Sequence, residues 1–357
     1  MKEQTRCVYF DVIRIVACIL VVCIHVSAMD FTMFEQSVSS WFVLNVINCI
    51  GMNGVPLFFM LSGALMLADT YTITFKKLFG KVLKLGALYY LVLFVYNLVP
   101  FLRGWVEWSP VMIRECLIEG VLYEGGVYHL WFLPVMMLLY LLSPILKEAF
   151  RKPKVCEYFL ILFFLGEAIL YTLTLFEYNG AIKRFVVYCQ EKNSIFPLGA
   201  YIGYFVLGHY LHSFVGKVSR RKVILIGITA IIANIFTITT CYMDAINKEY
   251  ASSVANTPLA LGVLISSSGI FVLMKQFCNN IQGEKKIKVL RYIASCTLGI
   301  YLLHPMVMNN IGFIQDMHLV ISNVLLLAIV KLISVTLISF FVVMILKGLT
   351  GILEIKK

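Results

Sequence analysis

Ten long apolar stretches run through this sequence, and they constrain its fold more than any other feature. Each stretch is close to the ~20 residues that a helix needs to cross the hydrocarbon core of a bilayer. Only 14% of the residues are charged, whereas water-soluble domains carry about a quarter. We therefore expect an all-α integral membrane protein, a bundle of ten transmembrane helices in one domain over residues 1–357. The predicted spans are 9–29, 41–68, 82–100, 129–146, 157–176, 195–214, 223–241, 257–275, 292–312 and 320–346.

The distribution of positive charge predicts how the bundle faces. Cytosolic loops of multispanning proteins are rich in Lys and Arg. The termini and alternate connections carry 22 of the 30 such residues, and the opposite connections carry 6. We therefore expect a protein of the plasma membrane with both termini in the cytoplasm. This bias explains the net charge of +11 and gives no reason to expect a nucleic-acid partner.

Other classes of protein are disfavoured by the cysteines and by the first span. The ten cysteines are scattered and lack the spacing of a metal site or a disulfide framework. We therefore expect no bound metal. The first span resembles a secretory signal peptide in length, but Asp11 and Arg14 interrupt the start of its apolar region. We expect it to be retained.

Ionisable side chains inside the spans are candidates for a functional site, because a charge in the bilayer core is costly. In the first span, the 11 residues from Arg14 to His25 make about three helical turns, so Asp11, Arg14 and His25 share one stripe. Arg14 is expected near the cytosolic mouth and His25 in the outer half, ~16 Å further along the axis. The stripe could line a tunnel. An interfacial ion pair and a structural histidine explain the same spacing equally well.

Two more histidines are expected at the outer depth. His304 follows Tyr301 in the ninth span, and His129 opens the fourth span next to Trp131. Imidazole is well matched to proton transfer near neutral pH, which favours a general-base site. In the alternative interpretations, Pro305 frees backbone carbonyls that His304 satisfies, and His129 belongs to an aromatic belt at the membrane interface.

Glu167 and Lys331 each lie in the middle of a span, and we expect them to neutralise one another across the bundle as a structural pair. On the cytosolic side, Lys76, Lys77 and Lys81 precede the third span. They either meet anionic lipid headgroups or hold the phosphates of a cytosolic nucleotide cofactor.

Five segments, in this order, resemble those of the acyltransferase 3 family of polytopic membrane acyltransferases. The resemblance covers essentially the whole chain. The segments are Tyr9-Phe10-Asp11-Val12-Ile13-Arg14 with His25, Gly54-Val55-Pro56-Leu57-Phe58-Phe59-Met60-Leu61-Ser62-Gly63, His129-Leu130-Trp131-Phe132-Leu133 running into Ser143-Pro144, Tyr204-Phe205-Val206-Leu207-Gly208, and Leu298-Gly299-Ile300-Tyr301-Leu302-Leu303-His304-Pro305.

The resemblance implies an enzyme that moves an acyl group, usually acetyl, from cytosolic acyl-CoA to a hydroxyl of an extracytoplasmic glycan or lipid-linked sugar. The Arg-x(10)-His element of the family falls on Arg14 and His25, which are the expected catalytic residues, with His25 as general base and Asp11 orienting Arg14. The residues expected to hold the CoA phosphates are Arg14, Lys76, Lys77 and Lys81. The residues expected to support the acceptor or the oxyanion are His304, Tyr301, His129, Trp131 and Ser62.

The chain departs from the family pattern in two ways. Lysines stand where the family often has an Arg-x-x-Arg pair after the second span, and no hydrolase-like domain is appended. Transfer is therefore expected directly to the acceptor or to a separate partner. A transporter or flippase for an amino acid or a glycan would use the same tunnel, and relatives fused to racemase domains are thought to move serine. A structural or sensor subunit is the third reading.

Overall fold

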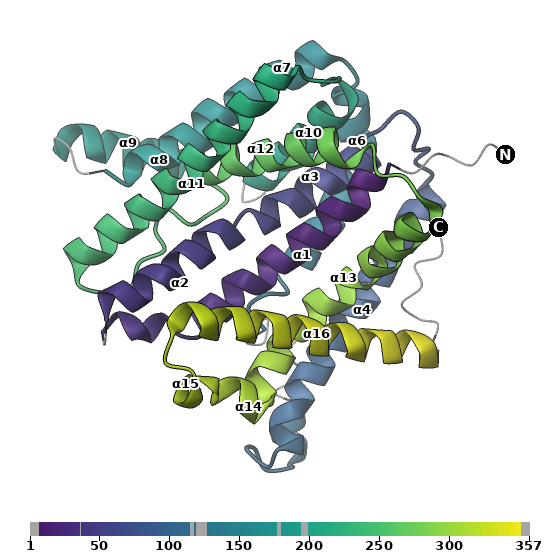
Figure 1. Ribbon diagram of the computed structural model, residues 1–357. Coiled ribbons are helices and arrows are strands. Elements are labelled where there is room, and N and C mark those ends of the chain that lie inside the picture. The colour runs from purple at the N-terminus through teal and green to yellow at the C-terminus, as the bar shows by residue number, and fades with distance from the viewer. Residues whose placement is uncertain are drawn as a thin grey trace. The chain divides into compact units, whose positions relative to one another are not determined.

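The computed structural model describes residues 7–35, 37–114, 118, 127–176, 180–193 and 199–350, and the regular structure among them is helical (Figure 1). The all-α fold expected from the apolar segments is thereby confirmed. The two chain ends lie outside the described residues, so the cytoplasmic location of the termini stays a prediction.

Eight helices in the described part of the chain are long and apolar enough to cross a membrane. They coincide with eight of the ten predicted spans. The other two spans correspond to α10 (Gly199–Ser213) and to α13 (Glu284–Asn310), whose first turns carry several charges. The chain is therefore a multispanning membrane protein, and the count of ten stays a prediction. The eight are α1 (Val8–Ala28), α2 with α3 (Val38–Gly51 and Gly54–Met66), α4 (Phe75–Leu102), α6 (Phe132–Ala149), α7 with the π-helix η3 and α8 (Pro153–Phe163, Phe164–Ile169 and Leu170–Thr174), α11 (Arg220–Lys248), α12 (Leu261–Cys278) and α16 (Val324–Thr350).

The chain divides into two compact units. The larger unit comprises residues 1–64 and 153–357, and the smaller comprises residues 65–152. Four of the shorter helices belong to the larger unit. They are η1 (Phe31–Phe34), α9 (Gly180–Asn193), α14 (Gly312–Gln315) and α15 (Met317–Val320).

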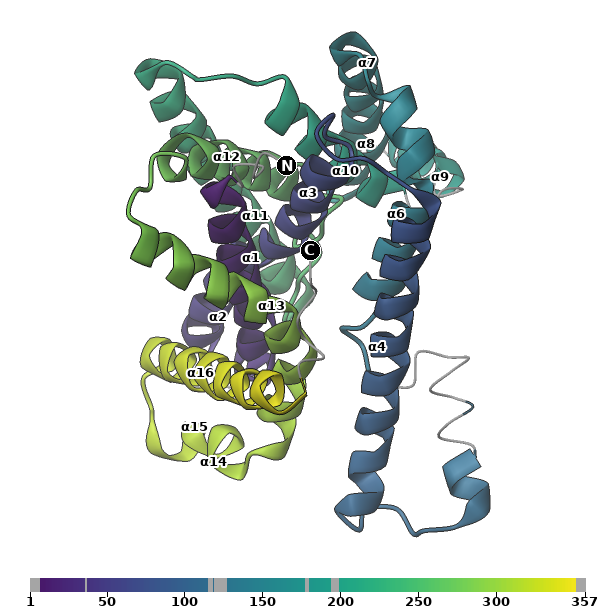
Figure 2. The same cartoon turned by 90° about the vertical axis from the view of Figure 1, so that its right-hand side faces the viewer.

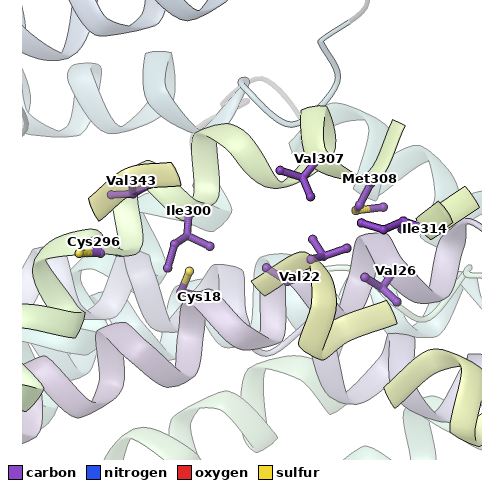
Figure 3. Close-up of a cluster of buried hydrophobic side chains, with 10 residues drawn as sticks. Cys18, Val22, Val26, Cys296, Ile300, Val307, Met308, Ile314 and Val343 are labelled. Atoms are coloured by element: carbon purple, nitrogen blue, oxygen red, sulfur yellow. The ribbon is translucent and has the colours of Figure 1, made fainter. Parts of the chain in front are cut away.

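Helix α1 is the central element of the larger unit, because α2, α12, α13 and α16 all pack against it (Figure 1). Cys18, Val22 and Val26 of α1 face Ile300 of α13 and Val343 of α16 in a buried apolar cluster (Figure 3). In a bilayer such contacts stabilise through close packing, since lipid tails are as apolar as the side chains. This packing holds α1 and α13, the two long helices that carry candidate site residues, in contact.

The second span is broken in its middle. Helix α2 ends at Gly51 and α3 begins at Gly54. Pro56 lies in the first turn of α3, where a backbone N–H has no acceptor within the helix, so proline costs no hydrogen bond there. A Cβ at Gly54 would lie 2.7 Å from the Ala17 carbonyl oxygen of α1. The close approach of this break to α1 therefore requires glycine at position 54.

Helices α3 and α10 cross so tightly that their backbones touch. A Cβ on Gly63 would fall on the Phe205 carbonyl, and a Cβ on Gly208 would fall on the Met60 carbonyl. Gly63 closes the second resembling segment and Gly208 closes the fourth. These two segments meet at one reciprocal crossing.

The smaller unit is built on α4 and α6, which pack side by side (Figure 2). The Thr74 side chain caps α4 by accepting the Lys77 N–H at 3.4 Å. Lys147 of α6 donates to the Ala68 and Tyr71 carbonyls at 2.6 and 2.5 Å. The connection into α4 is therefore tied to the end of α6.

The expected pairing of Glu167 with Lys331 is wrong. Lys331 of α16 donates to both carboxylate oxygens of Asp30, at 3.0 and 2.8 Å. The reason is topological: α16 packs against α1, and Asp30 follows the last turn of α1, whereas Glu167 belongs to η3. The lysine side chain is 1% exposed, so this ion pair is buried.

Candidate active site

Helix α1 carries Asp11, Arg14 and His25, and the structure shows the environment of each. Asp11 is buried, and its carboxylate lies 3.7 Å from the Arg14 guanidinium, which is 26% exposed. His25 is half-buried in the last turn of the same helix. The ion pair and the imidazole thus stand at opposite ends of the central helix.

His25 faces a second imidazole across the contact between α1 and α13. The ring centroids of His25 and His304 are 5.0 Å apart, and the ring planes are inclined by 31°. The Tyr301 ring lies 6.2 Å from the His304 ring on the same helix. Residues 279 positions apart in the chain therefore form one paired imidazole site.

The contacts of His304 assign its tautomer. Its Nδ1 lies 2.8 Å from the Tyr301 carbonyl oxygen and 3.2 Å from that of Ile300. Carbonyls only accept, so Nδ1 carries the proton. Pro305 lacks the N–H that would otherwise reach the Tyr301 carbonyl, and His304 supplies the missing donor. If the ring is neutral, its lone pair is then on Nε2.

Ser62 lies at a different depth from the imidazole pair. Gly51 approaches Leu20 and Ile24, and Gly54 approaches Ala17, so the broken span runs antiparallel to α1. Ser62 is eight residues beyond Gly54, or ~12 Å further toward the end of α1 that holds Asp11. The structure does not bring this hydroxyl to His25.

The other expected site residues belong to the smaller unit. His129 is buried, with its ring 5.5 Å from that of Tyr96 and 5.7 Å from that of Tyr128. Trp131 directly precedes α6 and packs its ring edge-on against Phe132. These two residues form an aromatic environment, as expected for either an acceptor site or an interfacial belt.

The three lysines at the start of α4 differ in their surroundings. Lys76 and Lys77 are exposed. Lys81 Nζ instead lies 3.5 Å from the Met66 sulfur and 4.6 Å from the centre of the Tyr71 ring. The exposed pair is therefore better placed for contact with phosphate in solution.

A cavity of about 400 Å³ opens at this end of the smaller unit, and its charges disfavour phosphate. Two of its lining side chains are carboxylates, and the amine of its one lysine already donates to two carbonyls. The lining residues are Asp69, Tyr71, Thr72, Ile73, Phe75, Pro144, Lys147 and Glu148. Phosphate contacts are better supported outside this cavity.

A metal centre has no support among the residues that the structure describes, which hold no group of three or more His, Cys, Asp or Glu side chains arranged for a metal ion. His212 is hydrogen-bonded to the Tyr9 hydroxyl at 2.6 Å, and His209 to the Ser213 hydroxyl at 3.2 Å. Both histidines of α10 thus take part in local polar contacts.

Sequence reasoning missed two sets of polar residues near His25. Asp30 lies one position beyond the predicted first span, so it was not counted among the buried charges. The buried amides of Asn48 and Asn256 carry no charge and give no signal in a search for ionisable groups. An asparagine within an apolar span would have been the available clue.

Comparison with known proteins identifies the family. The sequence profile of the acyltransferase 3 family, an acyltransferase domain, matches residues 8–347. The chain is also similar to an amino-acid racemase from Enterococcus faecalis, at 27% identity over 231 residues; the match covers 60% of this chain and 29% of the racemase. No solved structure matches significantly. The profile spans nearly all the described helices, and the chain therefore belongs to the acyltransferase 3 family of membrane acyltransferases.

Proposed function

We propose that this protein transfers an acetyl or other short acyl group from cytosolic acyl-CoA to a hydroxyl of an extracytoplasmic or lipid-linked carbohydrate, with His25 as general base. It would act in the plasma membrane, with both termini in the cytoplasm. The observation that carries the proposal is the arrangement along α1, where the ion pair of buried Asp11 with partly exposed Arg14 stands at one end and His25, beside His304, at the other.

The two ends of α1 suit the two substrates of such a reaction. Arg14 is partly exposed and held by Asp11, so it can contact a phosphate of the donor. Lys76 and Lys77 are further cationic candidates on the smaller unit. The thioester must then reach His25, ~16 Å along the axis of α1, and an extended pantetheine arm is the part of CoA suited to that distance.

The chemical step follows from the imidazole pair. A ring nitrogen of His25 accepts the proton of the acceptor hydroxyl while its oxygen attacks the thioester carbonyl. The new C–O bond forms, the C–S bond breaks, and the proton passes from His25 to the departing CoA thiolate. Since Nδ1 of His304 binds carbonyls, His304 would orient His25 rather than donate to the oxyanion. Tyr301 is the nearer candidate for donation.

The direct test replaces His25 in protein reconstituted with labelled acetyl-CoA and cell-envelope acceptor. His25→Ala should lower the transfer rate by about 10²–10⁴-fold, the usual contribution of general-base catalysis. His318→Ala is the matched control, because that histidine is exposed and its Nδ1 lies 2.7 Å from the Gln315 carbonyl oxygen of the adjoining turn, away from His25. A His25→Ala protein that transfers at the wild-type rate would remove His25 from the mechanism.

A transporter is the second candidate function, and two observations favour it. The chain resembles part of an amino-acid racemase, and the broken α2–α3 span is a feature that membrane transporters use to build substrate sites. A transporter should catalyse counterflow of a labelled amino acid in vesicles that contain no CoA. Counterflow without acyl transfer would favour this function over the enzyme.

A further inference from the structure

The connection between α11 and α12 is not helical, yet several of its residues are buried. It runs from residue 249 to residue 260, and Ser252, Asn256 and Ala260 are at most 6% exposed. Irregular backbone within a membrane protein persists only where protein or a polar cavity surrounds it. We refer to residues 249–260 as the docked loop.

Side chains from two other helices hold the docked loop in place. The Tyr171 hydroxyl donates to the Val254 carbonyl at 2.9 Å, and the Tyr204 hydroxyl donates to the Pro258 carbonyl at 2.6 Å. The two tyrosines belong to α8 and α10. The backbone on both sides of Asn256 is therefore fixed.

Asn256 passes this restraint to α2. Its side-chain amide donates to the Asn48 Oδ1, and both side chains are at least nine-tenths buried. An amide held at its oxygen cannot rotate freely about its last torsion. The docked loop thus sets the direction in which the Asn48 N–H groups point.

Those N–H groups reach the turn of α1 that carries His25. Asn48 Nδ2 lies 2.9 Å from the Ile24 carbonyl oxygen and 2.8 Å from the Ser27 hydroxyl. Ser27 in turn donates to the Cys23 carbonyl at 2.8 Å. The residues on either side of His25 are therefore bound to one side chain of another helix.

We propose that Asn48 is a positioning residue for His25: held by Asn256, its amide fixes the last turn of α1 and so the placement of the His25 ring against His304. The proposal rests on the proposed function, in which His25 is the base. Misplacing a catalytic group by about 1 Å can cost about 10²-fold in rate. An amide pair that only joined helices would affect stability and leave the His25 turn unchanged.

Asn45 provides a matched control on the same helix. It lies one turn before Asn48, is 1% exposed, and donates to the Ile238 carbonyl of α11 at 3.1 Å. Asn45 Oδ1 also accepts from the Cys49 thiol of its own helix at 3.3 Å, so Asn45→Ala removes buried amide bonds that do not involve the His25 turn of α1. Its effect on the protein measures the structural contribution alone.

The first measurement is hydrogen exchange by mass spectrometry on the full-length protein in lipid nanodiscs. Asn48→Ala and Asn256→Ala should each speed exchange of the backbone amides of residues 23–29 by about five-fold or more, since local opening governs exchange. Asn45→Ala should leave these amides within about two-fold of wild type. Asn256→Ala keeps Asn48 in place, so it tests the relay even where Asn48→Ala yields too little folded protein.

The second measurement is steady-state transfer by the same proteins. Asn48→Ala should lower kcat by about 10–100-fold and leave the KM for acetyl-CoA within about three-fold, because the donor phosphates bind elsewhere. Adding Asn256→Ala should have little further effect, since the two residues act in one relay. Asn45→Ala should keep kcat within about two-fold of wild type.

Three outcomes separate this proposal from the proposed function. Equal exchange of residues 23–29 in Asn48→Ala and Asn45→Ala overturns the positioning role. Faster exchange with unchanged kcat, while His25→Ala is inactive, also overturns it and leaves the proposed function intact. If His25→Ala is as active as wild type, the part of the proposed function that makes His25 the base fails, and the exchange measurement alone decides whether Asn48 fixes this turn.

Discussion

Removing one partner of the Asp30–Lys331 ion pair should destabilise the protein far more than removing a partner of an exposed pair. Lys331 Nζ lies 2.8 and 3.0 Å from the two carboxylate oxygens, and the side chains of Lys331 and Asp30 are 1% and 13% exposed. Loss of one partner of a buried pair costs about 3–5 kcal/mol, because the other charge stays buried without compensation. An exposed pair four residues apart on a helix contributes about 0.3–0.5 kcal/mol.

The two single variants should differ in stability, because Lys331 is more deeply buried than Asp30. Asp30→Asn leaves an ammonium that is almost wholly buried, so the loss of unfolding free energy should lie at the upper end of the range, about 5 kcal/mol. Lys331→Met leaves a carboxylate that water can still reach, so the loss of unfolding free energy should lie at the lower end of the range, about 3 kcal/mol. The double variant removes both charges and should recover most of the loss.

Unfolding free energies of the three variants, measured by detergent titration of purified protein, test this reasoning. Lys288→Met is the control, because its ammonium lies 2.7 Å from Glu284 while the side chains are 70% and 81% exposed. Two results would refute the argument. One is an Asp30→Asn cost within about 1 kcal/mol of the control; the other is a double variant as unstable as the sum of the singles.

Two further substitutions probe the helix crossing and the tautomer. Gly63→Ala should lower the unfolding free energy by more than about 3 kcal/mol, because the added methyl would meet a backbone carbonyl. Size-exclusion chromatography of this variant should show loss of folded protein. Gly80→Ala is the control, because that position is open, and it should keep the folded peak. Pro305→Ala returns a backbone N–H to the carbonyl that His304 now satisfies, and should lower kcat about 3–10-fold without loss of stability. Unchanged kcat would show that this bond does not orient the ring.

The helical fold follows from the sequence because long apolar segments have few alternatives in a bilayer. The interruptions inside the spans could not be predicted in the same way. Gly51 and Gly54 at the break lie against α1, which is a tertiary contact, and the π-helix η3 follows no simple pattern of apolar residues.

The site was partly predictable for a related reason. Periodicity within one helix places Arg14 and His25 on a stripe, and depth along two helices suggests that His25 and His304 lie level. The partner of Lys331 depends on which helices are neighbours, which hydropathy does not report. The Asn48 relay depends on a loop whose burial is decided by tyrosines far along the chain.

The crossing of α3 and α10 bears on how relatives of this protein should be read. Gly63 and Gly208 end two of the segments by which the family is recognised, and each is required by the backbone of the other helix. Such glycines encode architecture, so they are expected in any chain that folds this way, whatever it does. An acyltransferase and a transporter built on this scaffold would both keep them. Only the occupants of the imidazole site and of the Asp11–Arg14 end of α1 can tell the two apart.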